Sequence, residues 1–535
     1  MGTDSITSSE VTTPTQSSSP RIADLVEEAA RRSPEAPALV VTADRIPVSY
    51  RELLHLVDHL AAQLKQGGLL PGDRVALRAG SNAEFVVALL AASRAELIAV
   101  PLDPALPVSE LQVRSQAAGA RAVLVDDAAL GDVGDAAGQT LPCWPIAVTA
   151  GHAETAPAVS LDAATAPKHE FATPTGLRDD DAMIMFTGGT TGMPKMVPWT
   201  HSNIATSVRA IVAGYGLGPR DATVAVMPLY HGHGLLAALL ATLVSGGSVL
   251  LPARGRFSAH SFWDDIHAVR ASWYTAVPTI HQILLERAKT DQPSHAALRF
   301  IRSCSAPLTA ETAQALQDTF SAPVVCAFGM TEATHQVATT RIGSIDHREN
   351  PAATPGLVGR STGPEIGIVG SDGRPVPVDT VGEVWLRGPT VVRGYLGDPA
   401  ITAANFTDGW LRTGDLGTLS PNGDLIIRGR IKELINRGGE KISPERVEGV
   451  LASHPDVMEV AVFGVPDKVY GETVAAVIVP RGDATPTPEE LAEFGRERLA
   501  PFEVPVSFQQ ASELPHTAKG SLDRRAVAEK FGRRS

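Results

Sequence analysis

The chain has 535 residues, of which 44% are hydrophobic and 20% charged, a composition ordinary for globular proteins. Its length suffices for more than one domain, and its formal net charge of −13 excludes the basic surface that nucleic-acid binding requires. The three cysteines show no C-x-x-C spacing, which argues against a disulfide framework and a zinc cluster. We therefore expect a globular protein of the reducing cytoplasm without a nucleic-acid partner.

The sequence also lacks the patterns of export and of membrane insertion. No basic region followed by an apolar stretch opens the chain. The longest uncharged run, residues 234–253, is interrupted by Ser245, Gly246 and Gly247. This interruption predicts a buried helix followed by a strand, so no membrane span is expected.

The predicted elements start after a tail rich in serine and threonine, residues 1–19, which we expect to be disordered. Helices and strands then alternate. Helices are predicted at residues 22–33, 49–66 and 84–94, and strands at residues 38–41, 74–77 and 96–102. Such alternation is typical of an α/β protein with a mostly parallel sheet that helices cover on both faces.

The middle of the chain repeats this rhythm. Strands are predicted at residues 181–186, 223–226, 248–251, 273–276, 300–303 and 324–328, and helices at residues 235–243 and 281–288. In doubly wound sheets, ligands bind beyond the carboxyl ends of the strands. Because several unusual polar residues follow these predicted strands, we expect the functional site at that edge.

The pattern changes near residue 382, where short strand-like pieces replace the helices. Strands are predicted at residues 382–387, 424–428, 459–463 and 473–479, and helices at residues 444–451 and 488–499. We expect a large N-terminal domain, residues 20–429, with doubly wound mixed sheets and a β-rich subdomain. A small α+β C-terminal domain, residues 430–535, is expected to follow it.

A loop with the sequence TGGTTGMPK is the first candidate site. Its glycines allow backbone N–H groups to turn inward, its threonine hydroxyls add donors, and its lysine adds positive charge. After a strand, this composition predicts a loop that binds polyphosphate, and a flexible surface turn is the alternative. Pro194 and Pro198 argue against a helix directly after the loop, so it differs from the common P-loop. The candidate residues are Thr187, Gly188, Gly189, Thr190, Thr191, Gly192 and Lys195.

Two carboxylates follow later predicted strands or turns. Thr331 and Glu332 place a hydroxyl beside a carboxylate, which suits Mg²⁺ because this ion takes oxygen ligands; a solvated strand-end turn is the alternative. Asp415 follows a glycine turn. It has two interpretations, a ligand of ribose hydroxyls or a residue that only forms the turn.

Polar and titratable residues also gather after two other strands. His231 and His233 flank a glycine, and they have three interpretations: a zinc pair, structural histidines, or polar groups of a substrate pocket. No third zinc ligand is evident nearby. Arg302 and Ser303 end a predicted strand, and Cys304 after them is either a nucleophile or a packing residue.

Four of these segments occur in the order and spacing of the adenylate-forming superfamily, which the chain resembles from about residue 22 onward. They are residues 187–195, 328–332, 410–415 and 429–433. The superfamily contains acyl-CoA synthetases, adenylation domains of peptide synthetases and firefly luciferase. The resemblance implies an acid–thiol ligase that joins a carboxylate to AMP with release of pyrophosphate, and then transfers the acyl group to CoA. It implies ATP, Mg²⁺ and coenzyme A as cofactors.

The resemblance also implies roles in nucleotide binding. The loop at residues 187–195 would hold the β- and γ-phosphates, Thr331 and Glu332 would contact phosphate and Mg²⁺, and Asp415 would hold the ribose. Aromatic stacking on adenine survives with phenylalanine where the family usually has tyrosine. Further residues expected to bind the nucleotide are Ser305, Ala306, Pro307, Phe328, Gly329 and Arg430.

Other implied roles concern the C-terminal part. Lys432 matches the hinge about which a small, mobile C-terminal domain rotates between half-reactions. Gly438 and Gly439 would let CoA approach the backbone closely.

One position departs from the superfamily pattern. The usual P-K-T-x-x-G-K carries an essential lysine, whereas this chain has PHTAKGS at residues 515–521, with Ser521 at the lysine position. Lys519 lies two residues earlier, and residues two apart in an extended segment face the same way. We expect Lys519 to act as the catalytic cation; a protein impaired in adenylation, which only binds nucleotide or acyl-adenylate, is the alternative.

Several stretches are most similar to oxalyl-CoA synthetases of this superfamily. They are residues 230–236, 255–258, 273–282, 301–306 and 330–335. A small diacid such as oxalate needs cationic or hydrogen-bonding groups for its second carboxylate. The candidates are His231, expected to act in catalysis as well, and His233, Arg302, Ser303 and His335. A medium- or long-chain fatty acid, which would require an apolar tunnel, is the alternative substrate.

Overall fold

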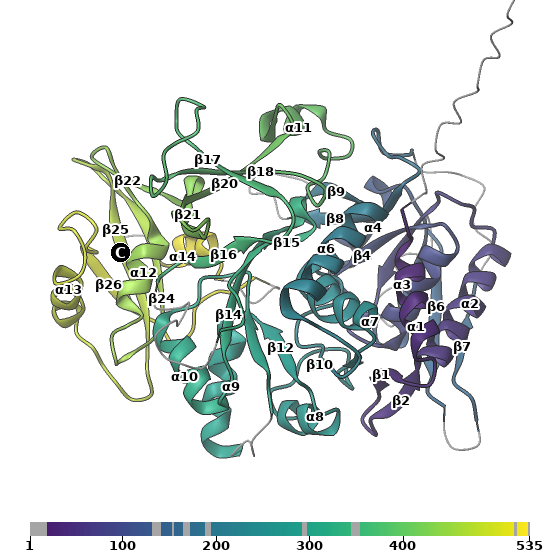
Figure 1. Cartoon of the computed structure of the whole chain (residues 1–535). Helices are drawn as coiled ribbons and strands as arrows, with labels where there is room; N and C mark the ends of the chain where they lie inside the picture. The colour runs from purple at the N-terminus through teal and green to yellow at the C-terminus, as the bar shows by residue number, and fades with distance from the viewer. Residues whose placement is uncertain are drawn as a thin grey trace, which may run out of the picture.

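Four β-sheets organise the chain in the computed structural model (Figure 1). The structure describes residues 19–130, 141–151, 155–163, 172–187, 194–291, 297–343, 354–517 and 522–532. Figure 1 shows the N-terminal sheet and its helices on the right, the C-terminal elements on the left, and a long sheet between them. The tail at residues 1–19 falls almost wholly outside the described residues.

The N-terminal sheet has seven strands in the order β7-β6-β5-β3-β4-β8-β9. Its strands are β3 (Arg74–Arg78), β4 (Ile98–Leu102), β5 (Ala120–Asp126), β6 (Cys143–Thr149), β7 (Ala158–Leu161), β8 (Asp181–Thr187) and β9 (Lys195–Thr200). The five inner strands are parallel and the two edge strands antiparallel. Every residue of β3, β4 and β5 is buried, so both faces are covered and the expected parallel sheet is confirmed.

The helices around this sheet begin and end where local signals place them. They are α1 (Ile22–Arg32), α2 (Tyr50–Gln66), α3 (Ala83–Arg94), α4 (Val108–Ala117), α5 (Asp127–Leu130) and α6 (His201–Tyr215). At the start of α2, the side chain of Ser49 accepts from the Glu52 N–H, and the Glu52 carboxylate accepts from the Ser49 N–H. This reciprocal pair is the capping box that the sequence predicted.

A four-stranded sheet joins the start of the chain to its middle. Its order is β10-β11-β1-β2, with β10 (Ala222–Val224), β11 (Ser248–Leu250), β1 (Pro37–Val41) and β2 (Ile46–Ser49). Helices α8 (Phe262–Ala268), α9 (Pro278–Asp291) and α10 (Ala310–Phe320) follow in the chain. Its strands β1 and β10 both pair in parallel with β11, so the N-terminal segment is tied to the middle of the chain.

The long sheet has ten strands and carries most of the candidate site. Its strands are β12 (Trp273–Ala276), β13 (Phe300–Ser303), β14 (Val324–Met330), β15 (His335–Thr339), β16 (Leu357–Ser361), β21 (Leu425–Arg430), β20 (Trp410–Leu419), β18 (Gly382–Arg387) and β17 (Glu365–Val369), with β19 (Phe406–Thr407) beside β20. Strands β12 to β14 are parallel, and every pairing from β14–β15 onward is antiparallel. The β-rich part therefore starts near residue 335, earlier than the change expected near residue 382. Helix α11 (Pro399–Asn405) packs beside β19.

The C-terminal elements form a separate five-stranded sheet. Its strands are β22 (Ile435–Arg437), β23 (Glu440–Ile442), β24 (Val457–Asp467), β25 (Gly471–Pro480) and β26 (Ser507–Gln510), and its helices are α12 (Pro444–Leu451), α13 (Pro488–Arg496) and α14 (Arg524–Phe531). Strand β21 ends at Arg430 in one sheet and β22 begins at Ile435 in the other. The domain boundary expected at residue 430 stays a prediction.

One predicted helix has an unexpected geometry. The apolar run expected to form a helix at residues 235–243 is a π-helix, His233–Leu240, followed by α7 (Ala241–Ser245). A Cβ on Gly234 would lie 2.3 Å from the carbonyl oxygens of Met227 and Pro228, so the first turn depends on this glycine. Wide π turns occur mainly at functional sites, and this one starts at a candidate residue. None of the described helices is long and apolar enough to cross a bilayer.

Candidate active site

The candidate site lies where β9, β13, β14 and the turn after β14 approach one another. The indole N–H of Trp199, on β9, donates to the carbonyl oxygen of Thr331 at 2.7 Å. The N–H of Val392 donates to the carbonyl oxygen of Glu332 at 2.9 Å. Two distant segments thus hold the backbone of the predicted phosphate- and metal-binding pair in place.

Glu332 is joined to the candidate phosphate lysine through a tyrosine. Only 8% of Glu332 is exposed, and its Oε1 accepts from the hydroxyl of Tyr395 at 2.9 Å. The Nζ of Lys195 lies 3.5 Å from the same hydroxyl and 4.5 Å from the centroid of the Tyr395 ring. The structure therefore brings Lys195 and Glu332 together, as the sequence predicted, and adds Tyr395 between them.

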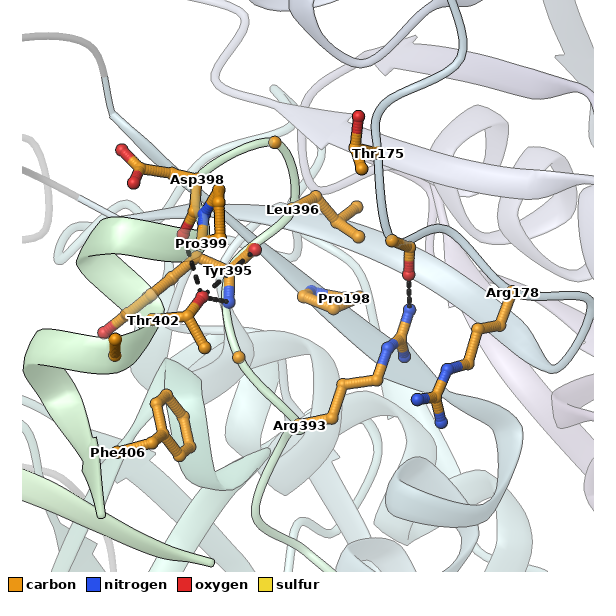
Figure 2. A pocket seen from close by; sticks show the side chains of 14 residues that line it. Thr175, Arg178, Pro198, Arg393, Tyr395, Leu396, Asp398, Pro399, Thr402 and Phe406 are labelled. Atoms are coloured by element: carbon orange, nitrogen blue, oxygen red, sulfur yellow. Dashed lines mark hydrogen bonds between the residues drawn. The ribbon is translucent and has the colours of Figure 1, made fainter.

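Both the backbone and the ring of Tyr395 are fixed by neighbouring side chains. Its backbone N–H donates to Thr402 Oγ1 at 2.9 Å, and Phe406 packs edge-on against its ring with centroids 6.0 Å apart (Figure 2). A cavity of about 450 Å³ lies here, and Arg178 and Arg393 are among its lining residues. None of the residues expected to bind nucleotide or acid lines this cavity, so we do not assign the substrate site to it.

The backbone after β14 is unusually constrained. A Cβ on Gly329 would lie 1.6 Å from the carbonyl oxygen of His335, and the β14–β15 register shifts between Phe328 and Gly329. Thr334 and His335 have φ values of 51° and 74°, in the left-handed region that non-glycine residues rarely adopt. Such strain costs about 1–3 kcal/mol per residue and gathers at functional sites. Here it lets the chain reverse within four residues and turns His335 toward β13.

Arg302 is the most deeply buried charge of this region. It is 0% exposed on β13. Its Nε donates to the Tyr215 hydroxyl (2.9 Å), its Nη1 to Thr275 Oγ1 (3.0 Å), and its Nη2 to His335 Nε2 (3.2 Å) and Gln336 Oε1 (3.0 Å). All four acceptors are neutral, and no carboxylate among the described residues pairs with Arg302.

His233 and His335 stack beside this guanidinium, with ring centroids 5.4 Å apart. Burial is the main reason that the pKa of each imidazole lies well below its usual value, and the charge of Arg302 lowers it further. Both rings are therefore neutral at pH 7. His233 Nδ1 lies 3.1 Å from Ser305 Oγ, and Nε2 lies 2.6 Å from Thr275 Oγ1.

These contacts bear on the zinc interpretation of the histidine pair. Both ring nitrogens of His233 are engaged in hydrogen bonds. His231 is partly buried, and its Nδ1 accepts from the His233 backbone N–H at 3.4 Å. Within the described ranges, no three histidines, cysteines or acidic residues are grouped to hold a metal. The polar-pocket interpretation fits this geometry better than a zinc pair.

The segment after β13 presents both buried and exposed groups. Ser303 is 2% exposed and its hydroxyl has no partner among the described residues, whereas Ser305 is exposed with a φ of 72°. Cys304 is 1% exposed, which favours the packing interpretation over a nucleophile. Ala306 is partly buried and Pro307 exposed beside it. Phe328 is partly buried on β14, so its contact with adenine stays a prediction.

Asp415 offers a carboxylate with one free oxygen. It is 3% exposed, and its Oδ1 pairs with the Nε of Arg430 at 2.9 Å across the β20–β21 ladder. Its Oδ2 is buried without a partner in the described part of the chain. Burial raises the pKa of this carboxyl, and the Arg430 charge opposes that rise. An unpaired buried oxygen is costly, and a ribose hydroxyl would satisfy it.

The predicted hinge lies between two groups of ion pairs. Lys432 is exposed within a short 3₁₀ turn, Ile431–Glu433. Before it, Arg430 pairs with Asp415. After it, the Nη1 of Arg524 contacts Glu433 at 2.5 Å. The residue before the turn is thus bound to β20 of the long sheet, and the last residue of the turn is bound to helix α14; the hinge role of Lys432 stays a prediction.

Gly438 and Gly439 form the two-residue turn between β22 and β23, with φ values of 61° and 100°. A tight hairpin needs glycine at such angles whatever it binds. The structure therefore explains both glycines without CoA, and their contact with CoA stays a prediction.

Some predicted residues lie outside the described part of the chain. They are Gly188, Gly189, Thr190, Thr191, Gly192 and Lys519. Thr187 ends β8, and it pairs with Lys195 at the start of β9. The two ends of the candidate phosphate loop are therefore adjacent in the sheet.

Sequence reasoning missed three residues of this region: Tyr215, Thr275 and Tyr395. Tyr215 ends α6 and Thr275 lies on β12, so both read as ordinary core positions. Their hydroxyls serve as two of the four acceptors that surround Arg302. For these residues, the one indication in the sequence was a polar threonine, Thr275, within an otherwise apolar predicted strand.

Comparison with known proteins defines the class. Residues 26–396 match the AMP-binding enzyme family, and residues 446–521 match the AMP-binding enzyme C-terminal domain. The chain belongs to the AMP-binding enzyme family.

Relatives that align with the chain over almost their whole length show which enzymes of the family it is similar to. The chain is 40% identical over 512 residues to an oxalate–CoA ligase of Arabidopsis thaliana, which covers 95% of this chain and 98% of that protein. It is 34% identical over 527 residues to an oxalate–CoA ligase of Saccharomyces cerevisiae, covering 93% and 95%. The crystal structure of ATP-bound MatB from Rhodopseudomonas palustris superimposes with a TM-score of 0.81 at 29% identity, covering 95% and 99%.

These findings confirm the resemblance to the adenylate-forming superfamily. They also confirm the α/β class with a large N-terminal and a small C-terminal part, and the acid–thiol ligase class. Enzymes of this class use ATP and CoA.

Proposed function

We propose that this chain is an AMP-forming oxalate–CoA ligase. It would adenylate oxalate with ATP, release pyrophosphate, and transfer the oxalyl group to the thiol of CoA with release of AMP. Relatives of matching length that are named oxalate–CoA ligases support this substrate. We place the enzyme in the cytoplasm, because its three cysteines are free.

The observation that carries the choice of acid is the buried charge of Arg302. It has four neutral acceptors and no carboxylate partner among the described residues. An uncompensated buried guanidinium costs several kcal/mol, and an anionic ligand nearby offsets that cost. His233, His335 and the unpartnered hydroxyl of Ser303 lie around it. This surrounding suits a second carboxylate and does not suit the apolar tail of a fatty acid.

Adenylation would proceed at the edge formed by β9, β13 and β14. One carboxylate oxygen of oxalate attacks the α-phosphorus of ATP, and the bond to the β-phosphate oxygen breaks. Lys195 is positioned to bind the departing pyrophosphate, and the unpartnered Oδ2 of Asp415 to accept from a ribose hydroxyl. The free acid group of the product stays near Arg302, which fixes the orientation of the adenylate.

The residues present fit magnesium. Glu332 is a buried carboxylate beside the hydroxyl-bearing Thr331, and Mg²⁺ commonly takes one or two carboxylates together with substrate phosphates. The ion would neutralise phosphate charge at this point. Tyr395 holds the Oε1 of Glu332, which leaves the other oxygen for the ion.

The second half-reaction would use the C-terminal elements. Lys432 would act as the hinge that separates a domain of residues 20–429 from one of residues 430–535, and Gly438 and Gly439 would line the path of CoA. The thiol sulfur attacks the acyl carbon, AMP leaves with the bonding electron pair, and the thiol proton passes to solvent. His231, close to His233, is the candidate to assist this transfer.

A pyrophosphate-release assay tests the proposal. Purified protein is mixed with Mg²⁺, ATP and either oxalate or octanoate. We expect oxalate to give at least about 100-fold higher kcat/KM, since an unpaired buried polar site rejects ligands that leave it unsatisfied. Faster turnover of octanoate would contradict the proposed acid, and no turnover of any carboxylate would contradict the proposed reaction.

A further inference from the structure

We propose that Arg302 and Thr275 are positioning residues that fix the tautomers of His233 and His335. In this arrangement two branches of hydrogen bonds start at Arg302, and both end on donors that face the second carboxylate of the acid. The inference rests on the proposed function, because it assigns the reason why the site takes a diacid.

The first branch runs directly to His335. Its Nε2 lies 3.2 Å from Nη2 of Arg302. A guanidinium can only donate, so Nε2 of His335 must accept through its lone pair. A neutral imidazole carries its single proton on the other nitrogen, so Nδ1 is a donor. Among the described residues this Nδ1 has no hydrogen-bond partner, which leaves its proton for a ligand.

The second branch runs through a threonine. Arg302 Nη1 donates to Thr275 Oγ1 at 3.0 Å. Among the described residues, His233 Nε2 at 2.6 Å is the one acceptor within reach of the Thr275 hydroxyl proton, so that proton is directed to it. Nε2 of His233 is then an acceptor and Nδ1 a donor, and Nδ1 meets Ser305 Oγ at 3.1 Å. The Ser305 hydroxyl accepts there and keeps its own proton to donate outward.

The surroundings hold both branches rigid. The guanidinium is also fixed by the Tyr215 hydroxyl and by Gln336 Oε1, and Tyr215 itself contacts Gln336 at 3.0 Å. His335 and Ser305, the last residues of the two branches, both have positive φ values, 74° and 72°. Strained backbone at both ends is what a site requires when donors must point to one place.

Thr275 cannot touch the substrate, because it is 0% exposed within β12. Thr275 contributes by directing its hydroxyl proton toward Nε2 of His233. The opposite tautomer of His335 would present a ring lone pair to the ligand, and the opposite tautomer of His233 would draw the Ser305 hydroxyl proton inward and leave an oxygen lone pair outward. Such lone pairs repel a carboxylate. A site whose outward groups are all donors favours an ionised carboxylate over an alkyl chain.

The test is the variant Thr275→Val, which keeps the shape of the side chain and removes the hydroxyl. We expect the KM for oxalate to rise about tenfold, since one hydrogen-bonded branch is lost, while the KM for ATP stays within about twofold. Thr275→Ser is the matched control, because it restores the hydroxyl and should bring the oxalate KM back to within about threefold of the parent. An unchanged oxalate KM in Thr275→Val, or an equal rise in both KM values, overturns the inference.

A second measurement reads the tautomers without turnover. Nitrogen-15 spectra of the histidine-labelled full chain distinguish a protonated ring nitrogen from a lone pair. We expect protonated Nδ1 in both His233 and His335, with the His233 signal altered in Thr275→Val. A protonated Nε2 in either ring of the parent overturns the inference even if oxalate is the substrate. If the tautomers are as expected but oxalate supports no pyrophosphate release, the proposed function fails instead.

Discussion

Two buried polar side chains of the candidate site lack, among the described residues, the partners that would offset the cost of their burial. Arg302 is completely buried with neutral partners only, and Asp415 has a buried oxygen without a partner among the described residues. Either feature alone would cost about 1–3 kcal/mol or more in a core. Arg302 lies near the carboxyl end of the parallel strand β13, whereas Asp415 lies within the antiparallel strand β20. Under the proposed function, a ligand that pairs with these groups would recover part of that cost when it binds.

The hydroxyl of Tyr395 gives a prediction about a single residue. It joins Lys195 to Glu332, so the variant Tyr395→Phe loses the hydrogen bond to the carboxylate and keeps the ring under the ammonium group. We expect the KM for Mg²⁺–ATP to rise about tenfold, because hydrogen bonds to charged groups contribute about 1.5–3 kcal/mol. Steady-state kinetics at varied ATP measures this.

A matched variant separates this effect from a general loss of packing. Tyr50 is also buried, and its hydroxyl donates to the carbonyl oxygens of Leu243 and Gly247, which are not among the candidate site residues. Tyr50→Phe should lower the melting temperature and leave the KM for ATP unchanged. If both variants raise that KM equally, Tyr395 has no special part in positioning Glu332.

Among the elements, the β14–β15 hairpin has the tightest geometry. Its register shift at Gly329 brings His335 back over β14, and a Cβ at this position would meet a backbone oxygen at 1.6 Å. No side-chain movement relieves contact with backbone atoms. The hairpin thus places Glu332 within the short turn Thr331–Ala333 and His335 at the start of β15, two residues after that turn.

Gly329→Ala should therefore destabilise the protein by at least about 3 kcal/mol, since the strand pairing must shift. Urea unfolding measures the loss. Gly214→Ala is the control: Gly214 lies exposed near the end of α6, where an added Cβ would meet no described neighbour within 4 Å. Alanine there should stabilise the helix by about 0.5–1 kcal/mol. A Gly329→Ala protein as stable as the parent would show that the bulge is not rigid.

Elements that depend on local patterns were predictable from the sequence. Strand β13 and helix α2 appear where their apolar run and capping box placed them. The π-helix at His233 and the bulge at Gly329 were not predictable, because each depends on backbone atoms brought close by the folded chain. The sequence did not indicate that the antiparallel part of the sheet begins at β15. This strand follows β14 after a short turn, with no helix between them, so the alternation of strands and helices gave no sign of it.

The sequence predicted residues of the candidate site only where they lie in recognisable motifs. Glu332 and Asp415 were candidates from their chemistry and position after a strand or turn, and the family resemblance favoured their binding roles over the alternatives. Tyr395 stands 200 positions from Lys195, and no spacing rule links them. The hydroxyl of Thr275 gained its meaning only from the buried guanidinium beside it.

At the scale of the molecule, one short turn connects the ten-stranded sheet to the C-terminal sheet, and helix α12 also contacts β21. Arg430 is bound to the ten-stranded sheet through Asp415, and Glu433 is bound to α14 through Arg524. The Nη2 of Arg524 also contacts Glu448 on α12. If Lys432 acts as the proposed hinge, rotation there would leave both groups of ion pairs intact and would change the contact between α12 and β21.

The proposed role of Lys519 gives a prediction for the whole molecule, since a catalytic cation near the C-terminus would have to reach the nucleotide from the far end of the sequence. Lys519→Ala should lower the rate of pyrophosphate release about 100-fold, the loss typical for a group that stabilises charge in a transition state. The double variant Lys519→Ala with Ser521→Lys returns the lysine to the usual superfamily position. We expect it to recover activity to within about tenfold, and full activity of Lys519→Ala would show that another cation does this work.

The most direct measurement of the central claim is the identity of the thioester. The protein is incubated with ATP, Mg²⁺ and CoA and an equimolar mixture of oxalate, malonate, acetate, octanoate and palmitate, and the CoA products are identified by mass spectrometry. A site built around the buried charge of Arg302 predicts oxalyl-CoA as the main product. Octanoyl- or palmitoyl-CoA as the main product, with no oxalyl-CoA, would contradict it.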